Sequence, residues 1–234
     1  MDFNMQTVLI TGASGNLGRA VAHAFARQDA NLVLLDRKME SLESVFGPAG
    51  TQRLYLPTDL LDPKQVQTAV TAAVAQFGRI DILCNIAGGF RMGSLVHETS
   101  DADWDFLIDI NARSMLQMVR AVVPGMLAGG SGKIINVGAN AAQKGIAQMG
   151  AYCASKDAVI RLTEAMAAEL RQSNINVNCV LPSIIDTPEN RSAMPAADAS
   201  RWVAPEALAD VITFLASDAA RAIYGASIPV TGQS

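Results

Sequence analysis

The chain has 234 residues, of which half are hydrophobic and 17% are charged, and its formal net charge is −4. This composition is typical of a globular protein with a large buried interior and argues against a disordered chain. Lysines and arginines are scattered along the sequence, so no basic patch is available to bind nucleic acid or an anionic membrane surface.

Short β-branched runs alternate with amphipathic segments from one end of the chain to the other. The predicted strands are residues 6–11, 31–36, 53–57, 80–86, 132–138, 175–181 and 226–230. Strands that alternate with helices predict a parallel sheet with helices on both faces. We therefore expect a single domain over residues 1–234, built on a doubly wound α/β sheet of about seven strands.

The first residues, MDFNMQTVLI, run directly into a strand and lack the basic start and apolar stretch of a signal peptide. Later apolar runs are interrupted well before the ~18 residues that a membrane span needs, so we expect a cytoplasmic protein. Cys84, Cys153 and Cys179 are widely spaced, and only two histidines accompany them. This pattern predicts reduced, mostly buried thiols and no metal site.

Two segments interrupt the alternation of strands and helices. Residues 88–100 are rich in glycine, and residues 183–204 contain two prolines among polar residues, with a third at Pro205. Both follow predicted strands, and ligands of open α/β sheets bind beyond the carboxyl ends of the strands. We predict that these segments are substrate loops.

The first predicted strand ends in TGASGNLG, in which Gly12, Gly15 and Gly18 recur at every third position. Glycine at these positions lets the backbone approach a diphosphate at the start of the helix expected near Asn16. Asp36 follows 18 residues after Gly18, at the end of the second strand, where it can accept both ribose hydroxyls of an adenosine. The pattern predicts a Rossmann-type site that prefers NAD(H), with NADP(H) left open because Arg37 adjoins Asp36.

Tyr152 and Lys156 stand four residues apart on a predicted helix. A nearby ammonium favours the phenolate form, so we expect Lys156 to lower the pKa of Tyr152 and to make it a usable acid or base. The alternative for such a pair is a solvated helix surface without a catalytic role.

Several motifs together resemble the short-chain dehydrogenase/reductase family. These motifs are TGASGNLG, NIAG at 85–88, Asn111, the Tyr-x-x-x-Lys pair at 152–156, Pro182 with Thr187, and the closing GASIPVTG. The resemblance covers nearly the whole chain. It implies an NAD(P)-dependent oxidoreductase that acts on a small molecule and forms a homodimer or homotetramer through helices around 103–127 and 151–172.

The resemblance also implies roles for individual residues. The catalytic set would be Asn111, Tyr152 and Lys156, with Asp59 near adenine, Asn85 supporting the sheet and Thr187 at the nicotinamide carboxamide. The full set expected to bind the cofactor is Gly12, Ser14, Gly15, Asn16, Leu17, Gly18, Asp36, Arg37, Asp59, Leu60, Asn85, Ala87, Gly88, Tyr152, Lys156, Pro182, Ile184, Ile185 and Thr187.

The chain departs from the family pattern at three positions. Asn16 stands where a glycine is common, Ser183 replaces the glycine that normally follows Pro182, and Ala139 occupies the position of the catalytic serine. Alanine at that position is similar to the dihydropteridine reductase branch of the family, as are IAGGF at 86–90 and LPSIIDTPENRSAMPAADASRW at 181–202. Asn111 differs from that branch.

A missing hydroxyl donor suits a substrate whose charge is delocalised during reduction, because one acid, Tyr152, then suffices. The leading hypothesis is therefore an NADH-dependent reductase of quinonoid dihydropterin, with Phe90, Ala139, Asn140 and Trp202 near the substrate and either Phe90 or Trp202 as the aromatic face on which it stacks. A second hypothesis is a ketone or 3-oxoacyl reductase or alcohol dehydrogenase in which Asn140 or Ser183 supplies the missing donor. A third is a regulatory protein that binds NAD(H) without catalysis.

Overall fold

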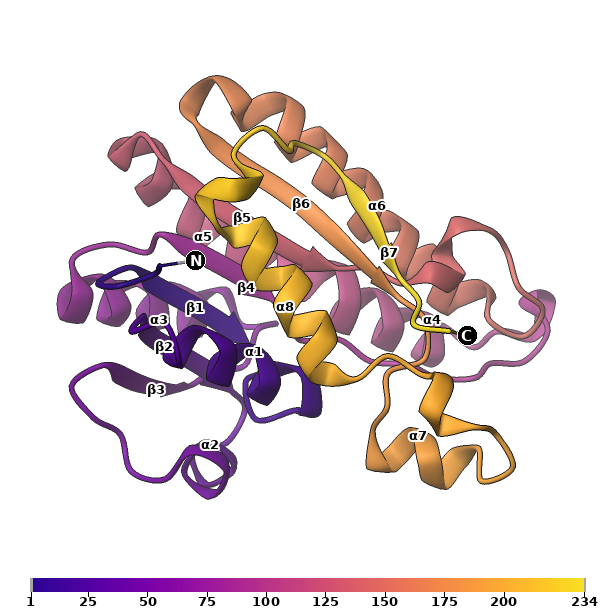
Figure 1. The fold of residues 1–234 in the computed structure, drawn as a ribbon. Helices are drawn as coiled ribbons and strands as arrows, with labels where there is room; N and C mark the ends of the chain where they lie inside the picture. Colours follow the sequence, from indigo (N-terminus) through magenta and orange to yellow (C-terminus); the bar gives the residue numbers. More distant parts are fainter. Residues whose placement is uncertain (1, 234) are drawn as a thin grey trace.

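The computed structural model describes residues 2–233 as a seven-stranded parallel sheet between two layers of helices (Figure 1). All seven predicted strands are present, each within two residues of its predicted limits, and the predicted fold class is confirmed. The strands are β1 Thr7–Thr11, β2 Asn31–Asp36, β3 Arg53–Pro57, β4 Ile82–Asn85, β5 Gly132–Val137, β6 Ile175–Pro182 and β7 Ser227–Val230.

The helices fill the intervals that the amphipathic segments occupy in the sequence. They are α1 Asn16–Ala26, α2 Met39–Phe46, α3 Pro63–Phe77, α4 Asp101–Ile108, α5 Ser114–Gly129, α6 Gly150–Leu170, α7 Pro188–Ala193 and α8 Pro205–Ala216. A π-helical turn, Asp109–Arg113, joins α4 to α5. Such turns displace side chains from the regular helical positions and occur often at functional sites.

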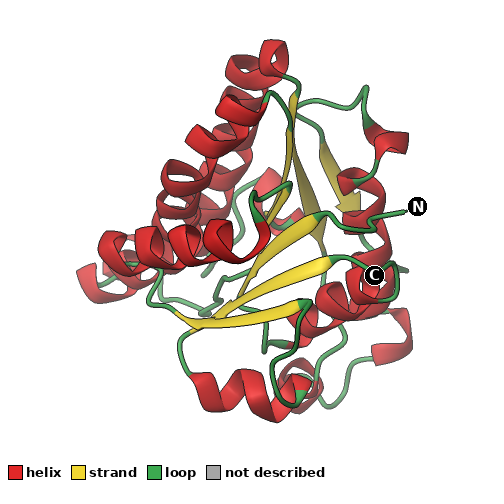
Figure 2. Ribbon diagram, turned by 90° about the vertical axis from the view of Figure 1, so that its left-hand side faces the viewer, coloured by secondary structure: helices red, strands yellow, loops and turns green. Residues whose placement is uncertain are grey.

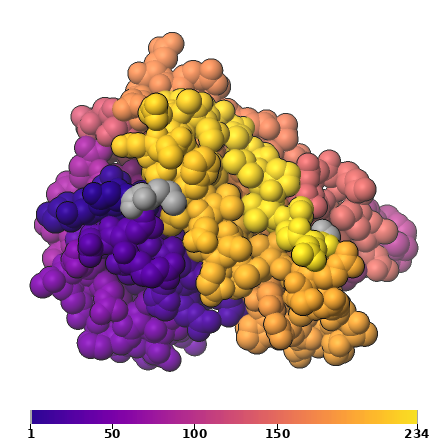
Figure 3. All heavy atoms as spheres, viewed as in Figure 1, coloured from indigo at the N-terminus to yellow at the C-terminus, as the bar shows by residue number. Residues whose placement is uncertain are grey.

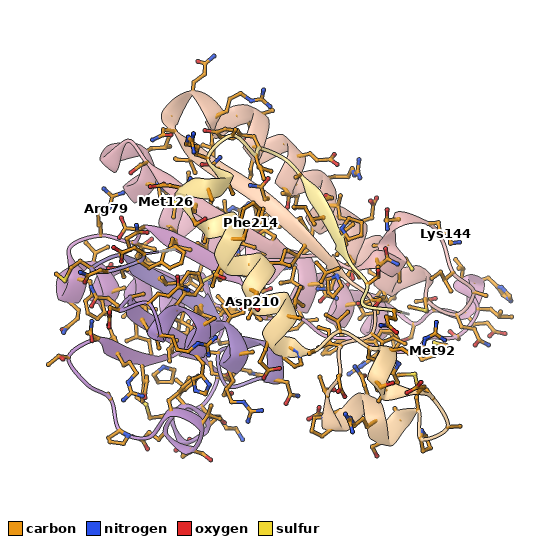
Figure 4. The ribbon with its side chains drawn as sticks, in the orientation of Figure 1. Arg79, Met92, Met126, Lys144, Asp210 and Phe214 are labelled. Carbon is orange, nitrogen blue, oxygen red and sulfur yellow. The ribbon has the colours of Figure 1, made fainter. Side chains whose placement is uncertain are left out.

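The strand order is β3-β2-β1-β4-β5-β6-β7. The strands β2 and β3 are therefore added on one side of β1 and the strands from β4 onward on its other side, so the switch point lies between β1 and β4. Ligands of such sheets bind at this switch point, outside the carboxyl ends of the strands. Figure 4 identifies that end of the molecule by Met92 and Lys144, which follow β4 and β5, whereas Arg79 precedes β4 and lies at the opposite end.

Each face of the sheet is covered by its own set of helices, as the side view shows (Figure 2). In β1, Val8 and Ile10 belong to the core formed with α1, α2 and α8, while Leu9 belongs to the core formed with α3, α5 and α6. Successive strand residues point to opposite faces, so a strand buried on both sides is apolar throughout.

A buried polar chain connects two strands to α6. Asn85 Nδ2 donates to Asn136 Oδ1 at 2.8 Å, and Asn136 Nδ2 donates to Thr163 Oγ1 at 2.8 Å. The predicted role of Asn85 in supporting the sheet agrees with this contact. Cys84, Cys153 and Cys179 are free thiols and buried, as predicted. Within residues 2–233, no helix has the length and apolarity to cross a membrane.

Replacing Asn136 with alanine removes the middle of this chain and leaves the Asn85 amide without its partner. We expect a loss of about 2–3 kcal/mol in the free energy of unfolding, because a buried donor left unpaired loses its solvation as well as its bond. Urea unfolding followed by circular dichroism measures it. Thr71→Ala, on the exposed face of α3, also removes one side-chain hydrogen bond and should cost far less stability. Equal losses for the two variants would contradict this account.

Candidate functional site

A cavity of about 620 Å³ opens at the carboxyl ends of the central strands. The predicted cofactor residues that line it are Gly12, Ser14, Gly15, Asn16, Leu17, Gly18, Asp36, Arg37, Asp59, Leu60, Ala87, Gly88 and Thr187. Further lining residues, which the sequence did not indicate, are Thr58, Leu61, Ile86, Phe106, Asp109, Ile110 and Ser114. Several of these come from the π-helical turn and its flanks, where the sequence reads as one amphipathic helix and carries no signal for a site.

The glycine turn has the shape that a diphosphate requires. Gly12 has φ of +61°, and a Cβ on Gly18 would lie 2.1 Å from the Gly12 carbonyl oxygen, so neither position accepts another residue without rearrangement. Gly15 caps α1, and no side chain satisfies the first N–H groups of that helix. The free N–H groups and the helix dipole suit an anion, so these residues fit an NAD(P)-type diphosphate.

Asp36 lies at the end of β2 and faces the same cavity. Its Oδ2 accepts hydrogen bonds from the Ser14 N–H at 3.1 Å and the Ser14 hydroxyl at 2.6 Å, and its Oδ1 accepts from the Arg37 N–H at 2.7 Å. The carboxylate is thereby held between the glycine turn and the end of β2, where the sequence predicted an adenosine ribose.

Lys156 and Asn111 meet beside Gly88. A Cβ on Gly88 would lie 2.9 Å from Asn111 Oδ1 and 3.0 Å from Lys156 Nζ, so only glycine lets the β4 loop pass here. The Lys156 side chain is 5% exposed, and its Nζ donates to the Val137 carbonyl oxygen at 2.9 Å. Burial lowers the pKa of this ammonium from 10.5 to about 8.

Tyr152 does not have the pKa that the sequence suggested. Burial raises the pKa of Tyr152 to about 12, and the charge that Lys156 was expected to supply is directed to Val137 instead. The expected lowering of the pKa of Tyr152 is therefore wrong for this structure, because desolvation disfavours the phenolate. Tyr152 carries its proton at neutral pH and can act as a proton donor.

Asn111 lies in the π-helical turn and fixes the loop after β4. Its Oδ1 accepts from the Gly89 N–H at 2.9 Å, and its Nδ2 donates to the Gly89 carbonyl and to Ser155 Oγ, each at 3.0 Å. The Ser155 hydroxyl donates to the Tyr152 carbonyl oxygen at 2.8 Å. Ser155 was not predicted, and it joins Asn111 to the helix that carries Tyr152 and Lys156.

The position of the missing serine is closed to solvent. Ala139 is buried at the end of β5, and its methyl group offers no donor. The Ser183 hydroxyl donates to the Thr231 carbonyl oxygen at 2.9 Å, so its proton is already used. Asn140 follows Ala139, and its Oδ1 accepts from Gln143 Nε2, which leaves the amide nitrogen as the donor end of the group. Of the two predicted replacements, Asn140 has the available donor.

Phe90 and Trp202, the two candidate rings for stacking on a substrate, differ in how far they are exposed. Phe90 is 54% exposed, and its ring meets Tyr152 edge to face with centroids 4.9 Å apart. Trp202 is only 8% exposed and belongs to the interior, so Phe90 is the one of the two candidate rings with an open face. An aromatic residue in an irregular segment packs that segment at least as often as it binds a ligand, and sequence cannot separate the two.

Several predicted cofactor residues lie outside the lining of the cavity. Asn85 points into the sheet, and Pro182 ends β6. The Ile184 and Ile185 carbonyls accept from Val203 N–H and Asn190 Nδ2, because residues 183–204 fold back on themselves. Tyr152 and Lys156 also lie beyond the lining, although Gly88, which belongs to it, approaches Lys156.

A family model described as short chain dehydrogenase matches residues 6–198. D-threitol dehydrogenase of Mycolicibacterium smegmatis is 35% identical over 245 residues, which cover 99% of this chain and 94% of that protein. A solved structure of NAD+-bound xylitol dehydrogenase has a TM-score of 0.89 at 27% identity and covers 99% of this chain and 98% of its own. A structure of ElxO with NADP bound has a TM-score of 0.90 at 26% identity, with 97% of each chain covered.

These matches confirm the predicted family resemblance. They do not support the finer likeness to dihydropteridine reductase. The similar proteins with a named substrate are polyol dehydrogenases and a 3-ketoacyl-(acyl-carrier-protein) reductase of Brucella melitensis. The short motifs behind that likeness lie in loops, where similar residues recur among proteins with different substrates.

Replacing Lys156 with methionine should stabilise the protein at pH 7 by about 1–2 kcal/mol, because the charged group is buried at a cost that its one carbonyl bond only partly offsets. The sign of the pH dependence follows from the lowered pKa. Between pH 8 and 10.5 the unfolded chain holds a proton that the folded chain has released, so the wild type gains stability as pH rises.

Urea midpoints at pH 7 and pH 10 check this prediction: the advantage of Lys156→Met should narrow at the higher pH. Lys144→Met removes an exposed lysine and serves as the control. If the stability difference between Lys156→Met and the wild type were the same at both pH values, or if Lys156→Met were the less stable at pH 7, the buried charge would not be the cause of the difference.

Proposed function

The chain belongs to the short chain dehydrogenase family of NAD(P)-dependent oxidoreductases, and on that premise we propose that it interconverts a secondary alcohol and its ketone with NAD(H). The observation that carries this proposal is that Asn111 and Lys156 both lie against Gly88, which lines the cavity, with Tyr152 one helical turn before Lys156. A protein that only senses NAD(H) needs none of these three side chains.

A polyol is the substrate class to test first. Its support comes from two of the similar proteins, which are named for threitol and xylitol, and from the side-chain amides beyond β5. Asn140 and Gln143 are already hydrogen bonded to each other, so they form a preset polar surface beside Ala139. Such a surface suits a hydroxylated chain better than a purely apolar ketone.

The residues have distinct roles in this proposal. NAD(H), when bound, supplies or accepts the hydride. Tyr152 donates its phenolic proton to the carbonyl oxygen in reduction and receives it back in oxidation. Lys156 keeps its ammonium on the Val137 carbonyl beside the Gly88 loop. Asn111 holds the Gly88–Gly89 loop, and Asn140 Nδ2 donates to the same oxygen as Tyr152, in place of a serine hydroxyl.

Reduction of a quinonoid dihydropterin is the second candidate. Two observations favour it: Ala139 supplies no donor, and the half-exposed Phe90 ring stands against Tyr152 where a planar substrate could stack. The two candidates differ in how much they need Asn140, because a delocalised charge does not depend on a second donor at one oxygen.

The donor role of Asn140 predicts a rescue. Asn140→Ala should lower kcat with a polyol or its ketone by about 10²-fold, as loss of one oxyanion donor typically does, and adding Ala139→Ser should restore most of it. Steady-state kinetics on polyols, simple ketones and quinonoid dihydropterin measure both steps. Tyr152→Phe should abolish turnover with every substrate.

Fast pterin reduction that is indifferent to Asn140→Ala would support the second candidate instead. Failure of Ala139→Ser to restore activity in a folded double variant would exclude Asn140 as the replacement donor.

The preference for NAD(H) rests on Asp36, whose charge opposes a 2′-phosphate and whose oxygens suit ribose hydroxyls. Asp36→Ala should weaken NADH binding by about 10-fold and narrow the ratio between NADH and NADPH. Fluorescence titration with both cofactors checks it. Asp29→Ala, at the turn before β2, removes a carboxylate away from the cavity and should leave the ratio unchanged. A wild type that binds NADPH more tightly than NADH would refute the assignment.

A further inference from the structure

A hydrogen bond connects two segments that lie far apart in the sequence. Asn16 Nδ2, at the start of α1, donates to Glu189 Oε2, in the first turn of α7, at 2.9 Å. Asn16 and Thr187, the residue that caps α7, both line the cofactor cavity. The space-filling view shows the orange segment that contains α7 beside the indigo and purple N-terminal half (Figure 3). The bond therefore joins α1 to α7 next to two residues that line the cavity.

Glu189 is charged at this position. Hydrogen bonds from its own backbone N–H, from Thr187 and from Asn16 lower the pKa of its carboxyl. Within residues 2–233 no lysine or arginine forms an ion pair with Glu189, and Arg191, the basic residue of α7, donates to both oxygens of Asp186 instead. The carboxylate therefore presents a negative charge at the N-terminus of α1 with only neutral donors around it.

The same helix end must accept the diphosphate of a nicotinamide cofactor. The first N–H groups of α1 have no side-chain cap, and Gly12 and Gly18 leave room for the anion. Asn16 stands at this end with an amide that already has an anionic partner. Two anions at one helix terminus repel each other, and one amide N–H cannot serve both at full strength.

We propose that Glu189 competes with the cofactor diphosphate for the Asn16 side-chain amide, so that the cofactor binds by exchanging one anion for the other. The inference uses the NAD(P) dependence of the family and is independent of the proposed substrate and of the preference for NAD(H). It also gives Asn16 a reason to stand where a glycine is common.

The exchange has a consequence for the segment that follows β6. Within residues 183–204 the other contacts of α7 are internal, from Asn190 to Ile185 and from Arg191 to Asp186. Loss of the bond to Asn16 therefore removes the side-chain hydrogen bond between α7 and α1 and leaves these internal bonds in place. Cofactor binding and the position of this predicted substrate loop become coupled.

Calorimetric titration with ADP-ribose, which has the diphosphate and lacks the nicotinamide, tests the competition directly. Glu189→Ala should tighten ADP-ribose binding by about 3–10-fold, and Glu189→Gln should tighten it by less, because glutamine keeps an acceptor for Asn16 but not the charge. Adenosine, which has no phosphate, should bind the wild type and both variants equally.

A double-variant cycle tests whether the effect of Glu189 passes through the Asn16 side-chain amide. In the Asn16→Ala background, Glu189→Ala should change the affinity for ADP-ribose by a much smaller factor, because only the charge repulsion at the helix terminus is left to relieve. Glu169→Ala, which removes an exposed carboxylate near the end of α6, is the charge-matched control and should have no effect. Thermal unfolding confirms that each variant is folded.

Unchanged or weaker ADP-ribose binding by Glu189→Ala would overturn the proposal. Weaker binding would mean that Glu189 helps to hold the cofactor, and unchanged binding would mean that it has no part in binding. A gain of the same size in the Asn16→Ala background would also overturn it, because the effect would then not pass through the amide. Neither result bears on which alcohol is oxidised, since no turnover is measured.

Discussion

The site depends on keeping one ammonium charge inside the protein. Lys156 lies within the interior and has a single carbonyl oxygen, that of Val137, as its hydrogen-bond partner among the described residues. A buried charge is tolerated only where the surrounding structure holds its partners in place. That requirement links the end of β5, which supplies the carbonyl, to α6, which supplies the lysine, and to the glycine loop after β4.

The loop after β4 also packs against the buried Lys156 ammonium. Gly88 passes between Asn111 and Lys156 with no space for a Cβ, and Asn111 binds both polar groups of the Gly89 peptide. The π-helical turn makes this possible, because it lets a residue between two regular helices direct its side chain at the loop. Ser155 then connects Asn111 to the backbone of Tyr152, so three elements share one network.

The departures from the family pattern each have a structural counterpart. Asn16, in place of a glycine, donates to Glu189 of α7. Ser183, in place of another glycine, donates to Thr231 and joins the start of the loop to the C-terminal segment. Ala139 is buried beside an amide pair formed by Asn140 and Gln143. Two of the substitutions replace a glycine by a residue whose side chain makes a specific hydrogen bond, and the third replaces a serine hydroxyl by a methyl group. All three lie at the carboxyl end of the sheet.

Periodicity and spacing were enough to predict the strands, the parallel sheet and the glycine turn, because each has a local signature in the sequence. The sequence did not determine the state of Tyr152 or the location of Trp202. The pKa of Tyr152 depends on burial by distant segments, and the exposure of Trp202 depends on how residues 183–204 pack. Contacts such as Asn16 with Glu189 and Asn111 with Ser155 join residues far apart in the chain, and only the tertiary structure brings such groups within hydrogen-bonding distance.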